Sequence, residues 1–141
     1  LCYGEAMVDT SHAEDEVLIR NLIGLAAHLA DEGEPDDYRV LYTPDATWSF
    51  GGSTQHGVEE IVAATRQRRA EGVSGPGTGT RHLVVPLHVT VNGDTATAVS
   101  YFLFLADTTG TPVVRVFGVY TDELVRTPEG WRIRSRTSRA G

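Results

Sequence analysis

Two residues with acid–base side chains come from distant parts of the sequence: Asp31 at the end of an expected helix, and His82 at the start of an expected strand. A neutral imidazole is a competent base near neutral pH. A carboxylate hydrogen-bonded to one ring nitrogen fixes the tautomer and stabilises the imidazolium that forms. Set among apolar side chains, the pair predicts proton transfer on a buried small molecule, with His82 as the base and Asp31 orienting it.

Aromatic side chains could form the walls of a substrate site around this pair. Ligand sites are mostly apolar with a few polar groups, and Trp48 in the segment DATWSF is the strongest single candidate. His28 lies three residues before Asp31 and therefore shares its side of the helix. The further expected substrate contacts are Phe50, Tyr38, Phe102, Phe117 and Arg136.

The basic cluster of the chain lies near its C-terminus, at Arg132, Arg134, Arg136 and Arg139. Strand alternation places Arg136 with its two preceding arginines, opposite Trp131, unless a bulge intervenes. We interpret the cluster as a solvated strand face or a subunit contact in preference to an anion site. The formal net charge of −7 argues against nucleic acid as a partner, because such binding depends on Lys and Arg neutralising phosphates.

Neither a metal nor a cofactor is expected. The five histidines show no His-x-His or His-x-x-x-His spacing, and the single cysteine, Cys2, cannot build a metal site. The Gly-rich stretch 71–80 (EGVSGPGTGT) lacks the lysine and the preceding strand of a phosphate-binding loop, so it indicates a linker or a lid. The cysteine content fits a reducing cytoplasm. No apolar run reaches the roughly 18 residues of a membrane span, and no secretion signal is expected.

Hydrophobic periodicity predicts the elements that position these residues. The expected helices are residues 12–30, a short segment from Pro35, and residues 58–70; the expected short strands are 47–50 and 53–56. From residue 81 onward the pattern predicts four long antiparallel strands in meander order, with Asn92-Gly93 in the first turn. This order predicts an α+β fold with helices on one face of a curved antiparallel sheet. A flexible segment, 1–11, is expected to precede a single domain, 12–141.

The long strands carry apolar residues on both faces. Tyr101 and Leu103 lie on one face, and Phe102 and Phe104 lie on the other. A sheet that is apolar on both sides needs two covers. Helices can cover one face, so we expect a homo-oligomer, a dimer or trimer, formed through the outer face.

The order of elements, the Arg81-His82 pair and the ending GVYTDELVRTPEGWRIRSR resemble the SnoaL-like branch of the nuclear transport factor 2-like superfamily, over about residues 12–138. The resemblance implies a cone-shaped barrel of curved antiparallel sheet with three N-terminal helices on its concave face. Within the branch, the chain is similar to bile-acid dehydratase, scytalone dehydratase and hexachlorocyclohexane dehydrochlorinase. Those enzymes remove a proton with a His–Asp dyad, which implies that role for His82 and Asp31. The resemblance also implies a pocket position for Trp48 and stabilisation of a leaving anion for Arg136.

One departure from these dehydratases concerns the tyrosine that assists a leaving hydroxyl, because the matching position here is Ala26. Polyketide cyclases and epoxide-opening cyclases of the SnoaL-like group therefore stay open as models. The leading hypothesis is a cofactor-free lyase or cyclase, acting by elimination or intramolecular ring closure on a small, mostly apolar, oxygenated molecule.

Two alternatives stay open at this point. A ketosteroid-isomerase type of enzyme needs an aspartate base with a tyrosine and a protonated aspartate inside the sheet. Tyr101 and Tyr120 are available, but Asp122 is expected near a strand end. The other alternative is a non-catalytic ligand-binding or subunit-association module.

Overall fold

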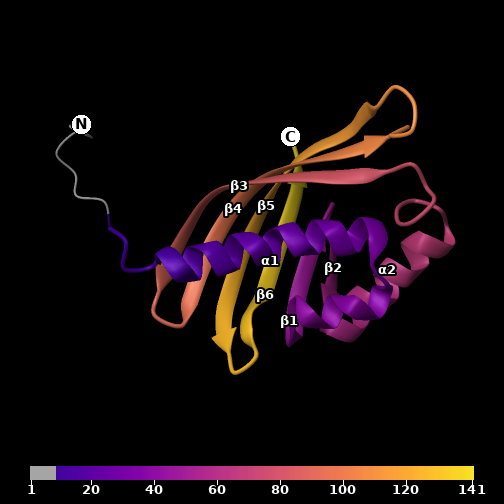
Figure 1. Ribbon diagram of the computed structural model, residues 1–141. Helices are drawn as coiled ribbons and strands as arrows, with labels where there is room; N and C mark the ends of the chain where they lie inside the picture. The colour runs from indigo at the N-terminus through magenta and orange to yellow at the C-terminus, as the bar shows by residue number, and fades with distance from the viewer. Residues whose placement is uncertain (1–8) are drawn as a thin grey trace, which may run out of the picture.

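The computed structural model describes residues 9–141 and shows an α+β fold in which helices cover one face of a curved sheet (Figure 1). The helices are α1 (Ala13–Glu32), the 3-10 helix η2 (Pro35–Val40) and α2 (Val58–Ala70). The strands are β1 (Tyr42–Phe50), β2 (Ser53–His56), β3 (Arg81–Asn92), β4 (Thr95–Ala106), β5 (Val113–Thr127) and β6 (Gly130–Ala140). The predicted fold class is thereby confirmed. Most of the expected flexible segment, with Cys2, lies outside the described residues.

Helix α1 forms because apolar residues recur every three or four positions and produce one buried stripe. Ile19, Leu22, Ile23 and Ala26 form that stripe, and the helix packs chiefly across β3. The stripe is continued at the last turn by Asp31, which is also buried. The apolar pattern that forms the helix therefore also carries an acid to the sheet. Among residues 9–141, no helix has the length and apolar character to span a membrane.

Asp15 connects the N-terminal half of α1 to the end of the sheet where β5 is followed by β6. Arg126 donates two hydrogen bonds to this carboxylate, at 2.8 and 2.9 Å, and the Trp131 indole N–H donates a third at 3.0 Å. These hydrogen bonds lower the pKa of Asp15 to about 2. The carboxylate therefore stays ionised at neutral pH and anchors the helix that carries Asp31.

The sheet has the strand order β2-β1-β6-β5-β4-β3, and it is curved without closing on itself. Strands β3 to β6 form the predicted antiparallel meander. The pair β1–β6 is parallel, which the prediction of an antiparallel sheet did not include. Because these two strands lie far apart in the sequence, no tight turn forces them to run in opposite directions.

A β-bulge in β6 decides which way its second half faces. Leu124 pairs with Ile133 and Glu123 pairs with Ser135, so Arg134 is an extra residue on β6. One extra residue reverses the inward and outward alternation. Arg136 is therefore buried on the same side as Ile133, and the expectation that it shares a solvated face with Arg134 was wrong.

Candidate active site

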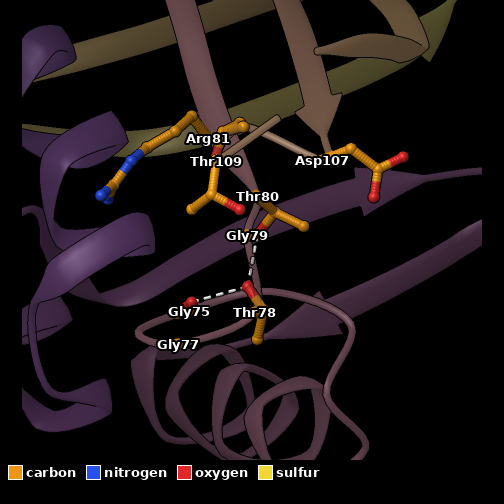
Figure 2. Close-up of a pocket in the computed structure, with 9 residues that line it drawn as sticks. Gly75, Gly77, Thr78, Gly79, Thr80, Arg81, Asp107 and Thr109 are labelled. Atoms are coloured by element: carbon orange, nitrogen blue, oxygen red, sulfur yellow. Dashed lines mark hydrogen bonds between the residues drawn. The ribbon is translucent and has the colours of Figure 1, made fainter. Parts of the chain in front are cut away.

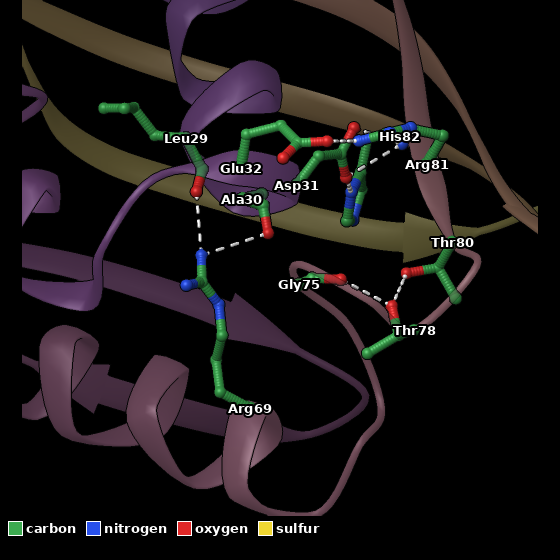
Figure 3. Close-up of polar contacts among 10 residues, drawn as sticks. All are labelled: Leu29, Ala30, Asp31, Glu32, Arg69, Gly75, Thr78, Thr80, Arg81 and His82. Atoms are coloured by element: carbon green, nitrogen blue, oxygen red, sulfur yellow. Dashed lines mark hydrogen bonds and ion pairs between the residues drawn. The ribbon is translucent and has the colours of Figure 1, made fainter.

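The acid–base pair predicted from the sequence is in contact in the structure (Figure 3). Asp31 comes from the last turn of α1, and His82 is the second residue of β3. The His82 ring Nδ1 lies 2.8 Å from Asp31 Oδ1, and the His82 backbone N–H donates to both carboxylate oxygens, at 3.0 and 3.2 Å. Asp31 therefore holds both the backbone and the ring of His82.

This geometry assigns different roles to the two ring nitrogens. Since Nδ1 faces a carboxylate, Nδ1 carries the proton and Nε2 presents its lone pair. The ring lies 4.8 Å from the Phe104 ring, measured between centroids, and the His82 side chain is 17% exposed. The site therefore places an imidazole nitrogen beside an apolar surface.

The C-terminal end of α1 is held in place by two arginines around the pair (Figure 3). Arg69, in the last turn of α2, donates to the backbone carbonyls of Leu29 at 2.9 Å and Ala30 at 3.3 Å. Both carbonyls belong to the last turns of the helix; the Leu29 carbonyl also accepts from the Gly33 backbone N–H at 3.0 Å, so Arg69 adds a second hydrogen bond there. Arg81 forms an ion pair with Glu32, next to Asp31. Both contacts hold the helix turn that carries the acid.

A surface cleft of about 370 Å³ lies at the Gly-rich stretch (Figure 2). Its lining includes Thr78, Thr80 and Arg81 together with residues 107–109. The Thr78 hydroxyl donates to the Gly75 carbonyl and is also 2.6 Å from the Thr80 hydroxyl. Because Thr80 and Arg81 line the cleft and directly precede His82, the cleft borders the strand end that carries the base.

A second polar cluster lies further inside, on the face of the sheet that the helices cover. Asp122 accepts two hydrogen bonds from the Arg136 guanidinium, at 2.7 and 2.9 Å, and both side chains are buried. Burial alone would lower the pKa of Arg136, but the adjacent carboxylate raises it above its usual value. Asp122 lies within the 15-residue strand β5, so the expectation of a strand-end position was wrong.

Tyr120 and Phe102 form an aromatic stack beside this ion pair. Their ring centroids are 4.2 Å apart, and the Arg136 guanidinium carbon lies 4.1 Å from the Tyr120 ring centroid. Burial raises the pKa of Tyr120 to about 12, so its hydroxyl keeps its proton at neutral pH. The stack requires glycine at position 118, where a Cβ would lie 2.3 Å from the Phe102 ring.

Trp48 and Tyr38 lie on the same face of the sheet, the face that the helices cover, which is called the inner side below. The Trp48 indole N–H donates to the Ser138 hydroxyl at 2.8 Å. The Arg68 guanidinium carbon lies 5.0 Å from the Trp48 ring centroid. Tyr38 is buried and stacks against Tyr42 with a centroid distance of 6.2 Å. Four of the expected substrate contacts therefore share the covered side of the sheet: Tyr38, Trp48, Phe102 and Arg136.

Three other expected substrate contacts do not join them. Phe50 is 47% exposed and lines a separate cleft at the end of β1. Phe117 is 45% exposed and packs against Tyr101 on the outer face, because it pairs with the outward-facing Leu103. His28 is exposed on α1. Arg68 was not predicted as a site residue, although its spacing of three residues from the buried Thr65 places it on the inward side of α2.

The family model for the SnoaL-like domain matches residues 11–137. The chain belongs to the SnoaL-like family. This SnoaL-like protein is 30% identical to an NTF2-like protein with a cystatin-like fold from Novosphingobium aromaticivorans, with a TM-score of 0.80; the match covers 91% of this chain and 82% of that chain. No curated protein matches the chain.

Two solved structures with lower identity share the fold of this SnoaL-like protein. One, from Novosphingobium aromaticivorans, is provisionally named a scytalone dehydratase; it is 19% identical, with a TM-score of 0.72, and the match covers 96% of this chain and 89% of that chain. The other, from Streptomyces avermitilis, is provisionally named a dehydratase of the NTF2-like family; it is also 19% identical, with a TM-score of 0.68, and the match covers 93% of this chain and 99% of that chain. At this identity, the likeness establishes the fold alone.

Proposed function

We propose that this protein is a cofactor-free acid–base enzyme that removes a proton from a small, mostly apolar, oxygenated molecule. The reaction is an elimination of water or an intramolecular ring closure. The observation that carries the proposal is the 2.8 Å contact between Asp31 and His82, with the ring placed against Phe104. General-base catalysis of this kind is typically worth about 10²–10⁴-fold in rate.

The proposed elimination balances without an added reagent. His82 Nε2 takes a proton from a carbon next to a carbonyl group, and the electron pair of the broken C–H bond forms an enolate. The imidazolium, stabilised by Asp31, then protonates the hydroxyl on the carbon next to the enolate carbon. The C–O bond breaks and releases water as the enolate electron pair forms the new C=C bond and the carbonyl is restored. In a ring closure, the enolate carbon attacks a second carbonyl group, and the same proton neutralises the alkoxide that forms.

A dehydration assay tests the proposal without knowledge of the natural substrate. 3-Hydroxy-1-tetralone loses water to give 1-naphthol, whose fluorescence reports the product. The purified protein is expected to accelerate this reaction over buffer. A panel that adds diketones able to close a ring tests the cyclisation. If no member of either set reacts faster than in buffer, the proposed chemistry is wrong.

Replacing Asp31 with asparagine is expected to change the tautomer of His82. The carboxylate accepts from Nδ1–H, whereas an amide can donate to an unprotonated Nδ1 and leave the proton on Nε2. Nitrogen-15 NMR of the imidazole measures which nitrogen carries the proton. The wild-type protein should show Nδ1–H at a pH where the ring is neutral, and Asp31→Asn should show a larger Nε2–H population. The same tautomer in both proteins would contradict the orienting role of Asp31.

The isomerase alternative is disfavoured by the partner of Asp122. That reaction needs a protonated aspartate that donates a hydrogen bond to the substrate oxygen. Here both carboxylate oxygens of Asp122 accept hydrogen bonds from Arg136, so neither is placed to donate to a substrate. The alternative of a binding module gives no reason for a buried carboxylate aimed at a histidine ring. Elimination and ring closure are therefore better supported than isomerisation or ligand binding alone.

We also propose that the protein is a homodimer through the outer face of the sheet. Four side chains there are each about half exposed: Leu83, Val85, Tyr101 and Phe117. Val85 pairs with Tyr101 across neighbouring strands, and Leu103 pairs with Leu83 on one side and with Phe117 on the other. A contiguous apolar patch of this kind is typical of an interface. Analytical ultracentrifugation should give a dimer for the wild type and mainly monomer for Val85→Lys. A wild-type protein that stays monomeric as its concentration is raised would contradict this contact.

A further inference from the structure

Arg68 is a cation on the buried face of a helix. The inward residues of α2 include Ile61 and Thr65, and Arg68 follows three residues later on the same side. Its guanidinium donates to the Thr65 hydroxyl at 3.0 Å and lies over the Trp48 ring. The side chain is partly buried. Arg68 is therefore directed to the covered side of the sheet, where Trp48 and Tyr38 lie.

The charge of Arg68 has no counter-ion among residues 9–141. Arg136 on the same side is matched by Asp122, and the neighbouring helix residue Arg66 is matched by Asp36 at 3.2 Å. No carboxylate among the described residues lies within ion-pairing distance of Arg68. A guanidinium has five N–H donors, and one bond to Thr65 leaves most of them unused. The inner side of the sheet therefore holds a cation with free donors.

The field of Arg68 reaches the tyrosines of the inner side. Burial raises the pKa of Tyr38, and the charge of Arg68 opposes that rise more than any other charged group. The charge of Arg68 also opposes the rise in the pKa of Tyr120. On the neighbouring strand β4, Ser100 pairs with Tyr120, and its fully buried hydroxyl has no hydrogen-bond partner among residues 9–141. Within the described part of the chain, the inner side thus combines a cation that has no counter-ion with a hydroxyl that has no hydrogen-bond partner.

We propose that Arg68 binds the substrate oxygen that becomes anionic when His82 removes a proton. This inference rests on the proposed function and assigns the polar end of the substrate, a ketone or phenol-type oxygen on an aromatic or fused-ring skeleton. Proton removal creates an imidazolium and an oxyanion together. Asp31 balances the imidazolium, and Arg68 balances the oxyanion. Trp48, whose ring faces the guanidinium, supplies an apolar surface for the skeleton beside that oxygen.

Binding of 2-naphthol tests the assignment without turnover. The neutral and ionised forms of this probe have different absorbance and fluorescence spectra, and the ionised form resembles the enolate of a bicyclic ketone. At a fixed pH, the wild-type protein should raise the ionised fraction of bound 2-naphthol about tenfold over that in solution, as expected for a hydrogen bond to a charged group. Arg68→Met should remove most of this increase.

Arg66→Met is the matched control, because Arg66 lies on the same helix and its side chain is 58% exposed. This variant should leave the ionised fraction of bound 2-naphthol unchanged. Arg68→Gln, polar and of similar length, decides the question if Arg68→Met does not fold. The proposal is overturned if the wild type does not favour the ionised probe, or if folded Arg68 variants favour it equally.

The probe 2-naphthoate separates an oxyanion that forms during the reaction from a carboxylate that the substrate already carries. Tight binding of 2-naphthoate without ionisation of bound 2-naphthol would assign Arg68 to a resident carboxylate and overturn the proposal. Arg68-dependent ionisation without any proton removal from ketones would overturn the proposed function and leave the anion site standing.

Discussion

Replacing His82 with glutamine is expected to slow 1-naphthol formation from 3-hydroxy-1-tetralone by about 10²–10⁴-fold, while the protein stays folded. Glutamine keeps polarity and approximate volume but has no basic nitrogen. Asp31 would still accept the backbone N–H of residue 82, so the strand end should keep its position. The loss should therefore fall on kcat, measured by the rate of product fluorescence at saturating substrate.

His88→Gln is the matched control for this prediction. His88 lies on the same strand, β3, but is exposed and lies outside the pair. Its replacement should leave kcat unchanged. A His82→Gln protein that turns over at the wild-type rate would show that another group removes the proton. A loss of activity accompanied by a loss of secondary structure in circular dichroism would assign His82 a structural role.

Replacing Asp122 with asparagine is expected to lower the free energy of unfolding by about 3–5 kcal/mol. The change leaves the buried Arg136 guanidinium with no counter-ion in the described part of the chain, and Asp122 itself is fully buried. An uncompensated charge inside a protein costs far more than the two hydrogen bonds that hold it. Urea unfolding followed by tryptophan fluorescence measures the difference.

Two further variants separate burial from charge. Asp94→Asn also removes an arginine partner, but Asp94 is 83% exposed, so the expected loss is at most about 1 kcal/mol. The double variant Asp122→Leu with Arg136→Met removes both buried charges and should be more stable than Asp122→Asn alone. If the free energy of unfolding of Asp122→Asn lies within about 1 kcal/mol of the wild-type value, Asp122 and Arg136 do not form the buried ion pair described above.

The elements, and the places of Asp31 and His82 within them, could be predicted from the sequence because local patterns determine them. The apolar spacing of α1 carries Asp31 to the helix end, and the Asn92-Gly93 signal marks the first turn of the meander, where Gly93 and Asp94 connect the paired residues Asn92 and Thr95. The contact between Asp31 and His82 spans 51 residues of sequence. Its prediction depended on the resemblance to the SnoaL-like branch, because spacing alone does not bring a helix end to a strand start.

The rest of the site depends on features that alternation cannot show. The extra residue at Arg134 turns Arg136 inward and thereby gives Asp122 its partner. A bulge leaves no simple mark in the sequence, so strict alternation gives the wrong face beyond it. Arg68 was missed for a different reason, since a charged residue at the end of an apolar stripe usually indicates solvent.

Exchange of the α-protons of 2-tetralone with deuterated solvent tests the central claim most directly, because it requires only proton removal and neither a leaving group nor a ring closure. Proton NMR measures the loss of the α-proton signals over time. The wild-type protein is expected to exchange them faster than buffer, and His82→Gln to lose that acceleration by about 10²–10⁴-fold. Exchange at the buffer rate by the wild-type protein, or equal exchange by wild type and His82→Gln, would contradict the role of His82 as a general base.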